Sequence, residues 1–154
     1  VGHSLAGITI PRAAARVSDR MKHLVYIATS NPPAGSSIAD LMKHALSPLS
    51  RNFDADFRNM FCSDLDDETT AWVRSKLEAE PPRPIIEPVS GVELPPGLKS
   101  TYILLKRDEV LPPDFQREQA LSANVDEIVP FDAGHSAFLT HPRELAELLL
   151  RFAA

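Results

Sequence analysis

The feature that most constrains the fold is the apolar run at residues 23–29, which reads His-Leu-Val-Tyr-Ile-Ala-Thr. A run without alternation between polar and apolar positions is typical of a strand buried on both faces of a parallel sheet. Two further strands are expected at residues 101–105 and 125–131, each followed by residues that can begin a helix. This alternation predicts an α/β fold in which helices cover both faces of a parallel sheet.

Helices are predicted at both ends of the chain. Residues 5–17 are rich in alanine and are expected to form a helix that starts directly after Ser4 and bends at Pro11, which removes one hydrogen bond. Residues 144–152 are expected to form a closing amphipathic helix.

Residues 36–98 have a different pattern. They contain helical stretches at 38–46 and 69–77 and a proline-rich segment at 81–84, but no clear core strand. We interpret this segment as a helical insertion between two strands of the sheet. The predicted organisation is therefore a core at residues 1–35, an insertion at 36–98 and the rest of the core at 99–154.

Composition and charge narrow the partners that we expect. The formal net charge is -5 and the basic residues are scattered along the chain, which disfavours nucleic acid. No segment has the apolar length that crosses a bilayer. Cys62 is the single cysteine, so no intramolecular disulfide can form, and we expect a reducing, cytoplasmic location.

We expect neither a metal nor a cofactor. No pair of His, Cys, Asp or Glu has the spacing of a zinc site, and no glycine-rich phosphate loop occurs. Cys62 is expected to be a buried small hydrophobic residue. The sequence leaves the oligomeric state open, a homodimer included.

The segment Gly-His-Ser-Leu-Ala-Gly at residues 2–7 fits the nucleophile elbow G-x-S-x-G, with Ala6 in place of the second glycine. A sharp turn between strand and helix would hold the Ser4 hydroxyl above the end of the sheet. The amide of Leu5 would then supply one oxyanion-hole donor. The alternative is a glycine-flanked serine that caps a helix.

Two further residues complete a serine triad in the order Ser, acid, His. Asp108 stands just past the strand at 101–105, and His135 follows the last strand. His135 would take the proton of Ser4, and Asp108 would orient the imidazole. For Asp108, the alternative is a solvated surface aspartate.

Other histidines and aspartates are weaker candidates. They are His3, His23, His44, His141, Asp114, Asp126 and Asp132. His3 lies within the elbow and is expected to pack or to form a hydrogen bond, and none of the other histidines closely follows a strand end. Asp114 is expected in a helix, Asp126 at the start of a strand, and Asp132 too near His135 in sequence for good geometry.

These segments together resemble the α/β-hydrolases that include plant-type methyl ester esterases, hydroxynitrile lyases and many bacterial esterases. The resemblance also rests on residues 20–28, Thr-Tyr-Ile at 101–103, Pro-Pro-Asp-Phe-Gln at 112–116, Gly-His-Ser at 134–136 and Pro-Arg-Glu-Leu at 142–145. It implies a three-layer α/β-hydrolase sheet, of which this chain is the C-terminal portion, with residues 36–98 as a helical cap. Apolar cap residues suggest an apolar pocket, although most are expected to form the core of the cap itself. They are Met42, Leu46, Phe53, Phe57, Met60, Phe61 and Trp72.

The triad and the resemblance imply hydrolysis of carboxylic esters through an acyl-enzyme on Ser4, and the apolar cap residues favour small, apolar substrates. Hydroxynitrile lyases of this family carry a lysine directly after the catalytic histidine, where this chain has Ser136. That difference favours an esterase, and carbon–carbon lyase chemistry on the same triad is the alternative.

Family members also carry strands before the elbow and a loop that provides the second oxyanion-hole amide. Neither lies within this sequence, which opens at Val1 inside the motif, so we expect a truncated sequence. Loss of one such donor typically costs about 100-fold to 1,000-fold in turnover. A third hypothesis is therefore a non-catalytic fragment or a small-molecule binding module.

Overall fold

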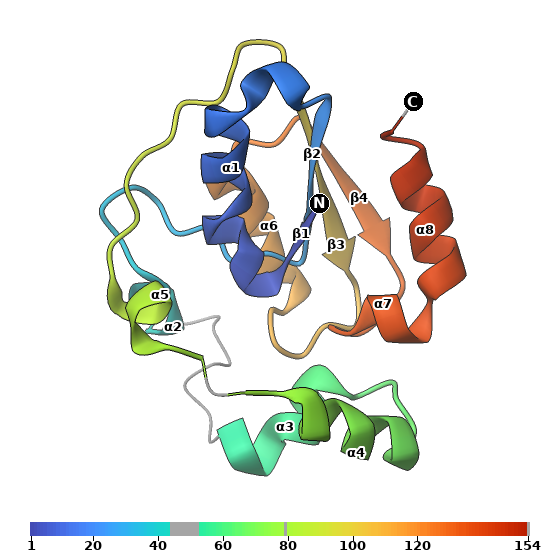
Figure 1. Cartoon of the computed structure of the whole chain (residues 1–154). Helices are drawn as coiled ribbons and strands as arrows, with labels where there is room; N and C mark the ends of the chain where they lie inside the picture. Colours follow the sequence, from blue (N-terminus) through green and yellow to red (C-terminus); the bar gives the residue numbers. More distant parts are fainter. Residues whose placement is uncertain (44–52, 79, 154) are drawn as a thin grey trace.

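The computed structural model describes residues 1–43, 53–78 and 80–153. Within them, four parallel strands form one sheet in the order β1-β2-β3-β4 (Figure 1). The strands are β1 (Gly2–His3), β2 (His23–Ile27), β3 (Lys99–Leu105) and β4 (Glu127–Phe131). In the register of the sheet, Tyr26 lies opposite Gly2 on one side and Tyr102 on the other. The parallel sheet predicted from the apolar run is confirmed.

Helices surround the sheet. They are η1 (Ser4–Ile8), α1 (Ile10–Arg16), η2 (Ser18–Arg20), α2 (Ile38–Met42), α3 (Phe53–Phe61), α4 (Asp67–Lys76), α5 (Pro82–Ile86), α6 (Pro113–Ser122), α7 (Ala137–Thr140) and α8 (Pro142–Leu150). Helices α1 and α6 lie on one face of the sheet and α8 lies on the other, so the fold has three layers (Figure 1). Helices α3 and α4 lie beyond the carboxyl ends of the strands, where parallel sheets place their sites.

The core follows from the two-residue period of the strands. On one face, Tyr26 packs with Ala14 of α1 and Ala120 of α6. On the other face, Ile27 packs with Leu145 of α8. Both faces of β2 are therefore covered, which explains why its sequence is apolar throughout.

The predicted helix at 5–17 is wrong in one respect, because two helices occupy this segment. Helix η1 ends at Ile8, and α1 begins at Ile10. Pro11 lies in the first turn of α1, so its missing N–H breaks no helical hydrogen bond and the predicted bend does not arise.

Segment ends also differ from expectation. Strand β2 stops at Ile27 because Ala28 has a φ of +41°, which is outside the extended region. Strand β4 begins at Glu127, since Asp126 instead accepts the N–H of Ser100. Helix α2 ends at Met42, with Lys43 as its C-cap, and residues 44–46 of the predicted 38–46 helix, with His44 and Leu46, lie outside the described residues.

The described part of segment 36–98 contains α2, α3, α4 and α5 and no strand, while the division into core and insertion stays a prediction. Met60 of α3 is buried against Leu111 and Phe115, so it anchors this segment to the rest of the protein instead of forming a separate core. Among the described residues, no helix combines the length and the apolar character that would span a membrane.

Candidate active site

Ser4 occupies a sharp turn at the carboxyl end of β1. It is the first residue of η1, and its φ of +53° lies in the left-handed region that non-glycine residues rarely adopt. Its carbonyl accepts the N–H of Ser30 at 3.1 Å, which ties the turn to the end of β2. A strained backbone held in this way is what the nucleophile elbow predicts.

The small residues beside Ser4 allow segments of backbone to approach closely. A Cβ atom on Gly2 would lie 2.7 Å from Cγ2 of Ile10, and one on Gly7 would lie 2.2 Å from the carbonyl oxygen of Ser30. Any larger side chain at Gly7 would therefore push η1 away from the strand end and displace Ser4.

Ser4, His135 and Asp108 form a continuous chain of hydrogen bonds. Asp108 Oδ2 accepts from His135 Nδ1 at 2.8 Å, and the distance between His135 Nε2 and Ser4 Oγ is 3.1 Å. Because a carboxylate only accepts, the proton of the neutral ring sits on Nδ1, which leaves Nε2 as the acceptor for the serine hydroxyl. This tautomer is the one that a general base at Nε2 requires.

Asp108 is fixed from its other side as well. Its Oδ1 accepts the backbone N–H groups of Val110 and Leu111 at 2.8 and 2.9 Å, in the turn that leads from β3 to α6. Asp108 and His135 are both buried, at 3% and 2% exposure, which strengthens their mutual hydrogen bond.

The weaker candidates are engaged elsewhere. Asp126 binds Ser100 and Lys99, Asp132 binds Arg107, and Asp114 lies in α6. His23 bonds to the hydroxyl of Thr101, and His141 bonds to that of Thr140. The structure thus brings together the three residues predicted from sequence, while their catalytic role stays a prediction.

His3 supports the backbone next to the triad. Its Nε2 donates to the carbonyl of His135 at 2.9 Å, and its ring lies against the His135 ring with 4.5 Å between centroids. Burial, with a smaller contribution from the neighbouring His135, lowers the pKa of His3 from 6.5 to about 3. His3 is therefore neutral at physiological pH and acts as a hydrogen-bond donor.

A hollow of about 380 Å³ opens above Ser4 and His135. Its walls come from the end of α3, from α4 and from the start of α7. The apolar lining residues are Phe61, Trp72, Val73, Leu77, Phe138 and Leu139. Phe61 and Trp72 were named from sequence as apolar residues of the insertion, whereas the other four were missed. Val73 and Leu77 are four residues apart, and this helical spacing is a signal that could have found them.

Leu5 and Ser136 flank the triad. Leu5 lies in the first turn of η1, where backbone N–H groups have no acceptor within the helix. The Ser136 hydroxyl donates to the carbonyl of Phe61 at 2.6 Å, so it is turned toward α3. No group of three or more His, Cys, Asp or Glu side chains among the described residues is arranged to hold a metal ion.

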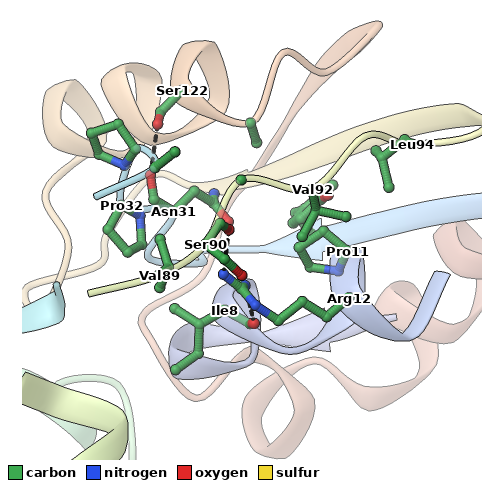
Figure 2. Close-up of a pocket in the computed structure, with 16 residues that line it drawn as sticks. Ile8, Pro11, Arg12, Asn31, Pro32, Val89, Ser90, Val92, Leu94 and Ser122 are labelled. Carbon is green, nitrogen blue, oxygen red and sulfur yellow. Dashed lines mark hydrogen bonds between the residues drawn. The ribbon is translucent and has the colours of Figure 1, made fainter. Parts of the chain in front are cut away.

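A second hollow, of about 230 Å³, lies between α1 and the segment at 89–94, and Ser4 does not line it (Figure 2). Its polar groups largely bind one another. Arg12 donates to the carbonyls of Ile8 and Ser90, and Ser122 donates to that of Asn31. The bond from Arg12 to Ser90 fastens the 89–94 segment to α1, and the bond from Ser122 holds the segment after β2 against α6.

The sequence model of the Alpha/beta hydrolase family matches residues 1–148. The chain belongs to the α/β-hydrolase family. A "Probable esterase PIR7A" from Oryza sativa is 27% identical over 184 aligned residues, which cover 100% of this chain and 69% of that protein. The resemblance inferred from sequence is therefore confirmed, and so is the α/β-hydrolase fold.

Solved structures show the same fold at lower identity. An extracellular α/β-hydrolase from a Paenibacillus species superposes with a TM-score of 0.81 at 23% identity, covering 97% of this chain and 69% of that one. The methylesterase protein MES16 from Arabidopsis gives a TM-score of 0.73 at 20% identity, with 97% and 66% covered. The chain is thus similar to hydrolases and esterases of the α/β-hydrolase fold.

Proposed function

We propose that this protein hydrolyses carboxylic esters of small, apolar substrates through an acyl-enzyme on Ser4. The observation that carries the proposal is the chain of hydrogen bonds that joins Asp108 to His135 and His135 to the Ser4 hydroxyl. Ser4 and His135 line the bottom of an apolar hollow. The similarity to a probable esterase from Oryza sativa supports the same reaction class.

In the first half-reaction, Ser4 Oγ attacks the ester carbonyl carbon while its proton moves to His135 Nε2. The carbonyl oxygen becomes an oxyanion, and the Leu5 amide is our candidate for one of its donors. The tetrahedral intermediate then collapses, the bond to the alcohol oxygen breaks, and His135 gives its proton to that oxygen. The alcohol leaves, and the acyl group stays on Ser4.

The second half-reaction repeats these steps with water. His135 removes a proton from water, whose oxygen attacks the acyl carbon, and collapse of the new intermediate returns the proton to Ser4 Oγ. The carboxylic acid is released. Asp108 stays ionised throughout, holds the Nδ1 proton and stabilises the imidazolium that forms twice in each cycle.

The lining of the hollow supports apolar substrates. A volume of about 380 Å³ lies in the range of small-molecule sites. Trp72, Leu77 and Phe138 remain about half exposed around it, at 52%, 56% and 49%, and a bound apolar group would cover them. The Ser136 hydroxyl is turned toward Phe61, so the position directly after His135 supplies no cation, whereas Lys76 of α4 lines the same hollow. The serine in place of a lysine at position 136 favours ester hydrolysis over cyanohydrin cleavage.

The test is turnover of p-nitrophenyl butyrate by the protein and by Ser4→Ala. Removal of the nucleophile should lower kcat to the level of the uncatalysed reaction or within about 10³–10⁴-fold above it. The matched control is Ser18→Ala, which removes an exposed hydroxyl in η2 and should leave kcat unchanged. Equal turnover by Ser4→Ala and by the unaltered protein would sink the proposal.

A further inference from the structure

Residues 134–136 are here called the histidine loop. Each of the three forms a hydrogen bond with a residue outside the loop. The Gly134 N–H donates to Asp64 Oδ2 at 2.8 Å. The His135 carbonyl accepts from His3, and the Ser136 hydroxyl donates to the carbonyl of Phe61. Phe61 and Asp64 lie at and just after the end of α3, so two of the three contacts come from the segment above the active site.

Asp64 is a largely buried acid outside the triad. Its side chain is 10% exposed, and its Oδ1 is buried without a hydrogen-bond partner among the described residues. Burial of an incompletely satisfied carboxylate is unfavourable, so such a group calls for a compensating role. The Gly134 N–H is the hydrogen-bond donor that the structure gives it, and that donor precedes His135 directly.

The glycine at position 134 is explained by the same carboxylate. A Cβ atom there would lie 2.7 Å from Asp64 Oδ1 and 2.9 Å from Asp64 Cγ. Alanine would therefore push the Asp64 side chain away from the histidine loop. Glycine at 134 thus permits the close contact that the hydrogen bond requires.

Arg107 lies between Asp64 and Asp132. Its guanidinium lies 3.7 Å from Asp64 Oδ2 and donates to the side chain and the carbonyl of Asp132, two residues before Gly134. Arg107 also directly precedes Asp108 in sequence. The carboxylate of Asp64 therefore faces both the loop that carries the base and the segment that carries the acid.

We propose that Asp64 is a positioning residue, which holds the histidine loop so that His135 Nε2 stays within hydrogen-bond distance of Ser4. The inference rests on the proposed function and deepens it, because it makes alignment of the base depend on the segment that covers the active site. A shift of about 1 Å in a catalytic group can cost about 100-fold in rate, so a lost loop contact is expected to act on kcat.

The first experiment measures kcat and KM for p-nitrophenyl butyrate in Asp64→Ala and Asp64→Asn. Asp64→Ala should lower kcat about 10-fold to 100-fold and leave KM within about twofold, because the apolar hollow is intact. Asn keeps an acceptor oxygen for the Gly134 N–H, so Asp64→Asn should recover most of the loss. Asp67→Ala is the control: this neighbouring carboxylate is 92% exposed, pairs with Arg58, and should change neither constant.

A second variant tests the contact between Asp64 and Gly134, and hydrogen exchange tests it without a measurement of activity. Gly134→Ala should lower kcat in the unaltered protein, and less so in an Asp64→Ala background, because both clashes with Asp64 are then absent and the 3.0 Å contact with Ser63 Oγ remains. Hydrogen exchange of the Gly134 amide should accelerate at least about 10-fold in Asp64→Ala, with the Val129 amide of β4 unchanged as an internal reference.

These readouts separate the inference from the proposed function. If Ser4→Ala abolishes turnover while Asp64→Ala leaves kcat and Gly134 exchange unchanged, the role of Asp64 is refuted and the esterase proposal stands. If the protein has no esterase activity but Gly134 exchange is still faster in Asp64→Ala, the proposed function is refuted and the contact between Asp64 and the loop stands. Equal losses in kcat for Asp64→Ala and Asp64→Asn would also refute the positioning role, because the shared acceptor would then be irrelevant.

Discussion

Replacement of His3 by glutamine should remove an acid-sensitive component of stability. In the native state, burial lowers the pKa of His3 from 6.5 to about 3, whereas the unfolded chain has the ordinary value. Below pH 6.5 the unfolded state therefore binds a proton that the native state excludes. The stability that depends on neutral His3 is present above pH 6.5 and is lost progressively as the pH falls toward 3.

The magnitude follows from the two pKa values. Each pH unit between them costs about 1.4 kcal/mol, so a drop from pH 6.5 to pH 5 destabilises the native state by ~2 kcal/mol through this one residue. A domain of this size has a typical unfolding free energy of about 5–15 kcal/mol, so the loss is large enough to measure. A glutamine side chain in place of His3 would not titrate, and its amide can still donate to the His135 carbonyl.

Urea unfolding at pH 7.5 and at pH 5 measures this effect in the protein and in His3→Gln. The drop in unfolding free energy between the two pH values should be ~2 kcal/mol smaller in the variant, because all other titrating groups are shared. An equal drop in both proteins would show that burial does not keep His3 neutral in the native state.

Three further predictions concern the triad, the elbow and the lyase alternative. Asp108→Asn should lower kcat for p-nitrophenyl butyrate by about 10⁴-fold with little change in the thermal midpoint, since the wrong histidine tautomer is then favoured; a loss below tenfold would contradict this. Gly7→Ala should destabilise the protein by about 1–3 kcal/mol or more in thermal unfolding. The control is Gly91→Ala, whose Cβ would meet Ala34 Cβ at 3.5 Å, and it should be neutral. Similar thermal midpoints for the two variants would argue against the close approach at Gly7. Mandelonitrile should release no cyanide above background, because Ser136 follows His135, and enzymatic release would restore the lyase alternative.

The sheet and the three candidate triad residues could be predicted from sequence because each rests on a strong local signal. The apolar run of β2 marks a doubly covered strand, and Ser4 lies in a motif whose small residues are required by contacts of the Gly7 backbone with Ser30. Asp108 and His135 follow strand ends, and parallel strands bring their carboxyl ends to one edge.

The contacts around the triad could not be predicted in the same way. Asp64 and Gly134 are 70 residues apart, and their hydrogen bond depends on how α3 packs on the core through Met60. The break between η1 and α1 was missed because helical propensity alone does not show where a close approach changes the helix. Tertiary packing determines both features, and it is difficult to infer from a single sequence.

Covalent trapping tests directly whether Ser4 is a nucleophile that His135 activates. The protein is incubated with a fluorophosphonate probe, digested, and analysed by mass spectrometry for the modified residue. One adduct is expected on Ser4, and its formation should be at least about 100-fold slower in His135→Ala. No adduct on Ser4, or labelling of Ser4 at the same rate without His135, would contradict it.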